Sequence, residues 1–357
     1  MINRFVNKGN YSFETAERDA AFELRRGAGW EKEYTAYRTA WQTRPAHKDP
    51  GEWPLLVDLE LSSVCNLKCP MCYTITDAFK AKVKRGLMPF AIFTRIIDEI
   101  AGHVPALRLS LRGEPALHPR FFDCIRYAKA AGIPEVSFLT NLGAIPEDRL
   151  EELVLSGADW ITVSVDGMGA TYEGIRRPLT FADTVRRLAL LREFRNKHGL
   201  PRPAVKVQSV WPAIREMYDQ YYAFFAARVD AVAFNPLIDY LGNDGIESIV
   251  FETDFSCPML YHRLTICSDG NALPCSNDEM SDMIVGNADT QDVYEIWHGK
   301  PLREMREVHS RVNGFLQYPV CKHCYLPRKV EEEMHSFDDG REFCVKNYAS
   351  RAQDIGL

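Results

Sequence analysis

The chain has 357 residues, of which 46% are hydrophobic and 26% charged, and its formal net charge at pH 7 is −6. This balance suits a globular protein with a sizeable core, and the negative charge argues against nucleic acid or an anionic membrane as a partner. We expect neither a signal peptide nor a membrane span, because no stretch approaches about 18 apolar residues, and we therefore expect a cytoplasmic protein.

Residues 1–53 are rich in charged and aromatic side chains and lack the alternation of a strand, so they predict a helical N-terminal extension. From residue 54 to 245, apolar segments of strand length alternate with amphipathic segments of helical spacing. The expected strands span residues 55–61, 106–111, 136–140, 160–165, 205–210 and 231–235. The expected helices span residues 91–102, 119–132, 147–156, 181–198 and 213–228. This rhythm predicts an α/β fold with a parallel sheet, either open or curled into part of a barrel, whose function lies at the carboxyl ends of the strands.

Residues 246–357 form a cysteine-punctuated region with few long apolar runs, and we expect its core to depend on bound metal. The chain has ten cysteines, which a reducing compartment would not pair as disulfides. Their grouping at positions 65/69/72, 257/267/275 and 321/324 indicates metal binding. Cys124 falls on an expected helix, where a small buried hydrophobic side chain is the simpler interpretation.

The first cysteine group follows the first expected strand, in SSVCNLKCPMCYT. Cys65, Cys69 and Cys72 form a C-x3-C-x2-C motif, and three thiolates can ligate three irons of a cubane while the fourth iron keeps an open position. A structural zinc site is the alternative, but it needs four ligands and no fourth is nearby.

This motif, with Tyr73 directly after its last cysteine, resembles the radical SAM superfamily over roughly residues 55–240. The resemblance implies a partial (β/α)6 TIM-like barrel and a catalytic [4Fe–4S] cluster that binds S-adenosyl-L-methionine. It further implies reductive cleavage of this cosubstrate to a 5′-deoxyadenosyl radical that abstracts hydrogen, with electrons from a reductant such as flavodoxin or ferredoxin.

Four further segments match the expected S-adenosylmethionine site of that family. Arg112-Gly113-Glu114-Pro115 resembles its GGEP segment with the first glycine replaced by arginine, and implies that Gly113, Glu114 and Pro115 hold the methionyl amino group. The resemblance also implies that ribose and carboxylate contacts come from Thr140, Asn141, Ser164, Asp166 and Arg176. Each of these residues taken singly also suits a turn or a solvated surface, but their order after successive strands favours one nucleoside site.

The second cysteine group comprises Cys257, Cys275, Cys321 and Cys324. Gly270 marks a hairpin between two short strands, LTI and ALP, that would bring Cys257 and Cys275 together, and the later CxxC would complete a four-thiolate cage. A zinc ribbon is the alternative. The pattern resembles the SPASM or Twitch extension of radical SAM enzymes, which implies one auxiliary [4Fe–4S] cluster, with Cys267 or Cys344 as possible replacement ligands.

The expected function is hydrogen abstraction from a sugar, aminocyclitol or related small polar metabolite, ending in oxidation, epimerisation or bond formation. A peptide- or protein-modifying maturase is an alternative, which the short N-terminal extension disfavours. A non-catalytic iron–sulfur electron-transfer or zinc-scaffold protein is the other. Candidate substrate contacts are Gln208, Trp211, Asn235, Asp239, Asn277, Asp278 and Glu279.

Overall fold

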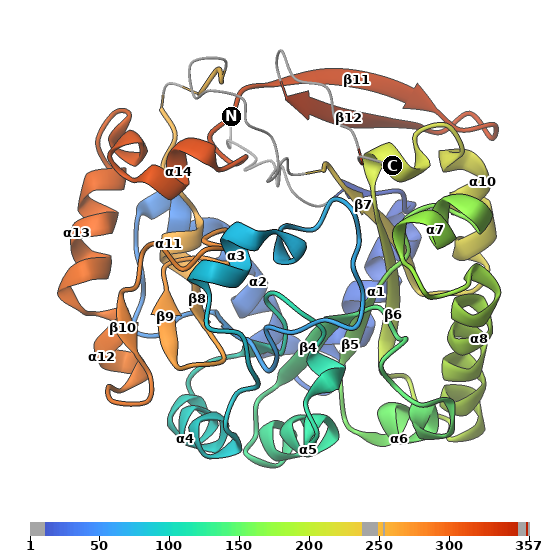
Figure 1. Ribbon diagram of the computed structural model, residues 1–357, viewed down its shortest axis with the longest axis horizontal. Coiled ribbons are helices and arrows are strands. Elements are labelled where there is room, and N and C mark those ends of the chain that lie inside the picture. Colours follow the sequence, from blue (N-terminus) through green and yellow to red (C-terminus); the bar gives the residue numbers. More distant parts are fainter. Residues whose placement is uncertain (1–10, 238–248, 253, 349–354, 356–357) are drawn as a thin grey trace.

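A curved, mostly parallel sheet organises the chain in the computed structural model, which describes residues 11–237, 249–252, 254–348 and 355 (Figure 1). Among these residues, one sheet holds strands in the order β1-β7-β6-β5-β4-β3-β2-β8-β9-β10. The parallel strands are β2 Leu56–Leu59, β3 Ala106–Arg108, β4 Glu135–Thr140, β5 Trp160–Ser164, β6 Ala204–Val210, β7 Ala231–Asn235 and β8 Arg263–Ile266. The antiparallel strands are β1 Tyr11–Ser12 beside β7, and β9 Asn271–Leu273 and β10 Gly286–Asn287 beyond β8. The predicted partial barrel is confirmed.

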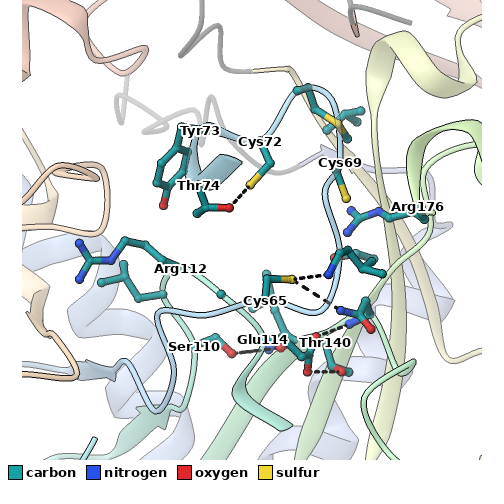
Figure 2. Close-up of a pocket in the computed structure, with 18 of the residues that line it drawn as sticks. Cys65, Cys69, Cys72, Tyr73, Thr74, Ser110, Arg112, Glu114, Thr140 and Arg176 are labelled. Atoms are coloured by element: carbon teal, nitrogen blue, oxygen red, sulfur yellow. Dashed lines mark hydrogen bonds between the residues drawn. The ribbon is translucent and has the colours of Figure 1, made fainter. Parts of the chain in front are cut away.

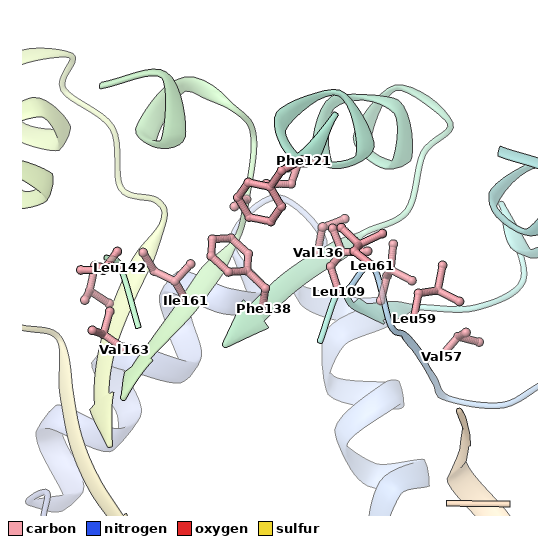
Figure 3. Packing of buried hydrophobic residues seen from close by; sticks show 14 of the residues in the cluster. Val57, Leu59, Leu61, Leu109, Phe121, Val136, Phe138, Leu142, Ile161 and Val163 are labelled. Carbon is pink, nitrogen blue, oxygen red and sulfur yellow. The ribbon is translucent and has the colours of Figure 1, made fainter. Parts of the chain in front are cut away.

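Crossover helices cover the outer face of this sheet (Figure 1). They are α4 Phe90–Ile100, α5 Phe121–Ala130, α6 Leu150–Leu155, α7 Gly169–Ile175, α8 Phe181–Lys197, α9 Trp211–Ile214 and α10 Tyr218–Ala226. The main core lies between the two layers, where Phe121 of α5 meets Phe138 of β4 edge-to-face at 5.0 Å (Figure 3). Alternate residues of each strand point to the opposite face of the sheet. There Asp58 of β2 and Arg108 of β3 form an ion pair at 2.7 Å.

The N-terminal helices α1 Ala16–Gly27 and α2 Glu31–His47 cover the amino ends of the strands. Phe22 of α1 packs on Ala204 and Ala231, which begin β6 and β7. Tyr34 and Tyr37 of α2 pack with Leu55, Leu56 and Ala106, at the start of β2 and β3. Within the described residues, these helices cover the amino ends of β2, β3, β6 and β7 and leave the carboxyl ends, the edge where parallel α/β proteins place their sites.

The expectation of one helix over residues 213–228 is wrong, because the chain turns between α9 and α10. Met217, at the N-cap of α10, leaves the helical region with φ −144°. The direction of α10 is set by tertiary hydrogen bonds: Tyr221 donates to the Val165 carbonyl at 2.7 Å and Tyr218 to the Ser336 carbonyl at 2.8 Å. Sequence periodicity carries no trace of these long-range contacts.

The C-terminal region contributes both to the main sheet and to separate elements. Strands β8 and β9 form the hairpin expected around Gly270, and β8 pairs with β2. The remaining described α-helices are α3 Asp77–Lys82 after β2, and α11 Met259–His262, α12 Val293–Trp297, α13 Lys300–His309 and α14 Pro319–His323 in the C-terminal region. Strands β11 Val330–Ser336 and β12 Glu342–Tyr348 form their own two-stranded sheet above the barrel (Figure 1). The domain boundaries after residues 53 and 245 stay predictions. None of the described helices has the length and apolar character needed to cross a membrane.

Candidate functional site

A cavity of about 300 Å³ opens at the carboxyl ends of the strands (Figure 2). The side chains around it come from the loop after β2, the loop after β3, the ends of β4, β5, β6 and β7, and the C-terminal end of α7. The sequence-predicted residues that line it are Cys65, Cys69, Cys72, Tyr73, Gly113, Glu114, Thr140, Asn141, Ser164 and Arg176. Residues far apart in the sequence therefore meet at one place, as expected from their positions after successive strands.

The three cysteines lie on a loop held in shape by its own backbone. The loop closes where the Ser63 N–H donates to the Gly86 carbonyl and the Met88 N–H to the Leu61 carbonyl, both at 3.0 Å. Within it, the Cys72 N–H donates to the Cys69 carbonyl at 3.0 Å. This folding turns the thiols of a short segment toward the same cavity.

The thiols share an environment that suits a cluster rather than free thiolates. Cys65 is exposed as a residue, but the protein around its thiol removes enough hydration to raise its pKa to about 11, and nearby charge on Glu114, Cys69 and Cys72 adds to the effect. Burial likewise raises the pKa of Cys69. Cys65 and Cys69 therefore hold their protons in the absence of metal, and binding iron would release these protons. The donor set therefore fits the cubane implied by the motif.

Gly113 brings the loop after β3 into contact with the cysteine loop. Its φ is +42°, and a Cβ at this position would lie 2.4 Å from the Val64 carbonyl oxygen and 2.5 Å from that of Ser62. The next residue, Glu114, donates its N–H to the Val64 carbonyl at 2.8 Å. Only glycine permits so close a backbone approach.

Glu114 presents a buried carboxyl group at the base of the cavity. It accepts hydrogen bonds from the Thr140 hydroxyl at 2.7 Å and from the Asn141 N–H at 2.8 Å. Burial raises the pKa of Glu114 to about 6, against these hydrogen bonds, which lower it. Near neutral pH the group is thus a fixed negative charge next to the cysteines.

Arg176 supplies a positive charge on the Cys69 side of the cavity (Figure 2). Its Nε donates to Asp166 Oδ2 at 2.7 Å, and Asp166 Oδ1 accepts the Val210 N–H at 2.9 Å. Burial alone would lower the pKa of Arg176, but the adjacent Asp166 carboxylate outweighs burial and raises it. Asp166 lies outside the cavity lining and holds Arg176 in place, and Pro115 also lies outside, at the start of a short 3-10 helix.

Arg112, which replaces a glycine of the family pattern, makes a buried ion pair with Glu60. Its Nε and Nη2 donate to the two carboxylate oxygens at 2.5 and 2.6 Å, and both side chains are almost fully buried. Its Nη1 reaches the Glu279 carbonyl at 3.1 Å and the Ser281 hydroxyl at 3.0 Å. The arginine therefore ties the cavity wall to the segment that follows Cys275.

The four cysteines of the second group also lie together. Burial raises the pKa of Cys275, and the neighbouring Cys257, Cys324 and Cys321 thiols raise it further. These thiols come from four places: before α11, after β9, within α14 and at its end. Within the described part of the chain, no group of three or more His, Cys, Asp or Glu side chains is arranged to hold a single metal ion.

The two leftover cysteines lie elsewhere. Cys267, at the end of β8, has Glu60 and Arg112 as its charged neighbours and its Sγ is 3.8 Å from the Ser281 hydroxyl. Cys344 lies on β12, where it pairs with Met334. Cys124 is fully buried on α5.

The candidate substrate contacts do not share one location. Asn235 lines the cavity, whereas Trp211 is buried against Phe234. Asn277 lies at the second cysteine group and donates to Cys324 Sγ at 3.4 Å. Asp278 accepts backbone N–H groups of residues 282 and 283, and Glu279 meets Arg112 through its carbonyl. Gln208 is on β6 outside the lining, and Asp239 lies outside the described residues.

Sequence reasoning missed other parts of the lining. These residues are Leu67, Met71, Thr74, Ser110, Leu111, Leu139, Val210, Pro236 and Leu237. Most are apolar and directly follow or precede a predicted position. Including one or two more residues on either side of each predicted strand end would have found them.

Two family models match the chain: the radical SAM superfamily over residues 59–210, and the iron–sulfur cluster-binding SPASM domain over residues 257–325. The chain is 26% identical over 264 residues to a tungsten-containing aldehyde ferredoxin oxidoreductase cofactor-modifying protein of Pyrococcus furiosus, with 71% of each chain covered. It is 30% identical over 142 residues to an AdoMet-dependent heme synthase of Methanosarcina barkeri, covering 39% of this chain and 40% of the relative.

Solved structures share the fold. Native anSMEcpe with bound AdoMet matches with a TM-score of 0.55 at 15% identity, covering 76% of this chain and 88% of its own. BtrN in complex with AdoMet and 2-DOIA matches at 0.52 and 18%, covering 76% and 92%. Streptococcus suis SuiB bound to precursor peptide SuiA matches at 0.52 and 16%, covering 82% and 76%. The solved structures confirm the fold, and the two family models confirm the radical SAM and SPASM regions with the iron–sulfur cofactors expected from the cysteine motifs.

Proposed function

The chain is a radical SAM enzyme with a C-terminal SPASM domain, and we propose that it abstracts hydrogen from a small polar metabolite at the cavity described above. The observation that carries this proposal is the meeting of three thiols with Glu114 and Arg176 around one cavity. When bound by Cys65, Cys69 and Cys72, a [4Fe–4S] cluster supplies the electron that splits S-adenosylmethionine into methionine and a 5′-deoxyadenosyl radical.

The side chains around the cavity bind and orient the cosubstrate. Glu114 carries a negative charge near neutral pH and pairs with the methionyl amino group, while Arg176, held by Asp166, pairs with the methionyl carboxylate. Thr140, Asn141 and Ser164 offer polar groups for the ribose. Two fixed charges of opposite sign distinguish the two ends of an amino acid, and so set the direction in which it binds.

The second cysteine group gives the reaction an electron acceptor. We infer that Cys257, Cys275, Cys321 and Cys324 bind one auxiliary [4Fe–4S] cluster, since their thiols lie together and CxxC is followed by no further cysteine pair. A substrate radical that loses one electron to this centre and one proton to water becomes a product oxidised by two electrons. Oxidation is therefore favoured over epimerisation or bond formation.

The size of the cavity favours a small substrate. A volume of about 300 Å³ is at the lower end for ligand sites, and the cosubstrate needs most of it. The substrate then approaches on the side of Asn235, Pro236 and Leu237, away from Glu114. A sugar or aminocyclitol presents one carbon–hydrogen bond at such an opening, and BtrN, a protein of the same fold, is solved with 2-DOIA.

A peptide substrate is the second candidate, and one observation favours it: SuiB, also of this fold, is solved with its precursor peptide. A single side chain of a peptide would need no more room than a sugar carbon. A third candidate is modification of a cofactor, the activity in the name of the Pyrococcus furiosus relative, and this too would be chemistry on a small molecule.

The reductant approaches the first cluster at the loop that carries Cys65, Cys69 and Cys72. Residues 61–90 contain five cations, Lys68, Lys80, Lys82, Lys84 and Arg85, and one acid, Asp77, in a chain whose net charge is −6. The five cations are exposed, as is Cys65. A local charge of opposite sign attracts an acidic electron donor of the flavodoxin or ferredoxin type.

One experiment tests the proposal. Protein reconstituted with iron and sulfide without oxygen is incubated with reductant, S-adenosylmethionine and separate panels of nucleotide sugars, aminocyclitols and peptides. We expect 5′-deoxyadenosine that carries deuterium from a labelled sugar or aminocyclitol. Deuterium transfer from peptides alone would favour the second candidate, and absence of 5′-deoxyadenosine under all conditions would contradict radical chemistry at this site.

A further inference from the structure

Two side chains outside the cysteine set contact sulfurs of the second group through a nitrogen atom. His309, the last residue of α13, is 1% exposed, and its Nε2 lies 3.6 Å from Cys321 Sγ. Its ring stacks on Tyr318, with centroids 5.3 Å apart and an interplanar angle of 25°. Its Nδ1 meets no hydrogen-bond partner among the described residues. The stacking fixes the ring plane, and the thiol is the group at which Nε2 points.

Asn277 makes the matching contact on the other cysteine of the CxxC pair. Its Nδ2 donates to Cys324 Sγ at 3.4 Å, and the Leu326 N–H donates to the same sulfur at 3.5 Å. Asn277 follows Cys275 by two residues, so the backbone that carries one cysteine also carries the donor to another. Cys321 and Cys324 are thus each in contact with a side-chain nitrogen. A cysteine that binds metal as a thiolate has no proton to donate, so a hydrogen bond between His309 and a metal-bound Cys321 requires the proton on Nε2.

Hydrogen bonds to cluster sulfurs are one of the factors that set the reduction potential of an iron–sulfur centre. An N–H aimed at a thiolate withdraws electron density from its sulfur. This stabilises the reduced cluster, which carries the extra negative charge, more than the oxidised one. The effect is stronger where water is excluded; Cys257 and Cys275 are buried, and Cys321 and Cys324 are partly buried.

We propose that His309 and Asn277 are positioning residues that raise the reduction potential of the auxiliary cluster by donating N–H···S hydrogen bonds to Cys321 and Cys324. The inference rests on the proposed function, because it assigns a task to the cluster inferred there. In that task the substrate radical loses one electron to the cluster and one proton to water. The cluster later passes the electron to an oxidised flavodoxin- or ferredoxin-type partner. A higher potential makes the first of these transfers more favourable.

The test is a potentiometric titration of the full-length chain, followed by electron paramagnetic resonance. Cys65, Cys69 and Cys72 are all replaced by alanine in this chain, so that only the auxiliary cluster is observed. His309→Phe keeps a ring on Tyr318 but has no N–H, and His309→Gln keeps an N–H. Asn277→Leu removes the second donor. We expect His309→Phe and Asn277→Leu each to lower the midpoint potential. The shift should be equivalent to about a three- to tenfold change in the ratio of reduced to oxidised cluster, a tenfold change being about 59 mV for one electron.

His309→Gln should retain most of the parent potential, and the exposed His103→Phe should retain all of it. An unchanged potential in His309→Phe and Asn277→Leu at full iron content would overturn the proposal. It would also be overturned if His309→Phe lost the iron of this cluster, since His309 would then be a ligand. A parent chain that binds no second cluster would contradict the proposed function itself, and iron analysis of the parent separates that result from the others.

Discussion

Arg112 occupies a position where the family pattern has glycine, and the structure accommodates it with a partner from the preceding strand region. Glu60 accepts two of its N–H groups, and the segment after Cys275 accepts the remaining contacts. The arginine could be identified in the sequence as a departure from the pattern. Its partner could not, because fifty-one residues separate the two and nothing in either local segment indicates the pairing.

The ion pair of Arg112 and Glu60 should couple strongly in a double-mutant cycle. Removing either partner leaves a buried charge without compensation, so Arg112→Met and Glu60→Leu should each lower the free energy of unfolding by about 3–5 kcal/mol. The double variant should cost clearly less than the sum. Urea denaturation of the four proteins measures this, and additive single effects would contradict the pairing. The exposed pair of Arg186 and Glu147 serves as control and should show little coupling.

Gly113→Ala should disrupt the first cysteine loop. A Cβ at this position would lie 2.4 Å from the Val64 carbonyl oxygen, so the backbone on either side must move. We expect reconstituted protein to lose about the four irons of one cubane, measured by iron analysis, and to lose 5′-deoxyadenosine formation with it. Gly102→Ala is the matched control: its φ is also positive, at +79°, but no atom lies within 4 Å of the added carbon. Equal iron content in both variants would count against the role given to this close approach.

Glu114 should make cosubstrate binding depend on pH. Because burial raises its pKa to about 6, the carboxylate is charged above that value and takes up a proton as the pH falls through it. Affinity for S-adenosylmethionine should therefore weaken between pH 7.5 and 5.5, as the methionyl amino group loses its partner. Glu114→Gln should bind about ten- to a hundredfold more weakly at pH 7.5, with a flatter pH profile. Equilibrium binding to reconstituted protein measures both, and parallel profiles would assign the pH dependence to a group other than Glu114.

Strand-end residues illustrate the limit of residue-level prediction. Thr140, Asn141 and Ser164 were expected at a nucleoside site from their positions after strands, and all three line the cavity. Asp166 was expected there by the same rule, yet it faces the Val210 N–H and Arg176. The end of a strand can be seen in the sequence, but the direction of a side chain beyond that end depends on which neighbours it meets.

At the scale of elements, the strands of the barrel and the β8–β9 hairpin were predictable, whereas the break between α9 and α10, the pairing of β8 with β2 and the β11–β12 hairpin were not. The six expected strands of the barrel are present because each is a short apolar run between turn residues. The pairing of β8 with β2 joins residues more than two hundred positions apart. Strands β11 and β12 escaped prediction because β11, with the sequence VEEEMHS, is largely exposed and has no apolar face to show.

The β11–β12 hairpin is held to the barrel by aromatic packing around Phe337. This ring lies 5.5 Å from Phe13, 5.3 Å from Tyr222 and 4.9 Å from Phe343. A two-stranded hairpin is marginal by itself, so Phe337→Ala should release it while the parallel strands stay folded. Hydrogen exchange should speed up over residues 330–346 and not over β4 and β5. Unchanged protection in the hairpin would contradict this, and Met334→Ala, at an exposed site on the same strand, is the control.

At the scale of the whole molecule, charge is unevenly distributed along the chain. The chain is acidic, with a net charge of −6, yet the segment from residue 61 to 90 has a net charge of +4, from five cations and one acid. The cation-rich segment includes α3 (Figure 1) and the first cysteine loop, whose three cysteines line the cavity. An acidic donor is repelled by most of the surface and attracted where the electron must enter.

Reversing charge in this segment should slow electron entry from a protein donor. Lys68→Glu with Lys84→Glu should lower the rate at which an acidic flavodoxin reduces the first cluster, followed by stopped-flow absorbance, by at least about tenfold at low salt. The difference from the parent should shrink as ionic strength rises, because exposed charges are screened within about 10 Å at 0.1 M salt. Lys32→Glu with Lys300→Glu makes the same change in net charge on α2 and α13 and should have a much smaller effect. Reduction by dithionite, a small donor, should be similar in the two double variants. Equal slowing of flavodoxin in both would show that net charge, and not a docking face, controls the reaction.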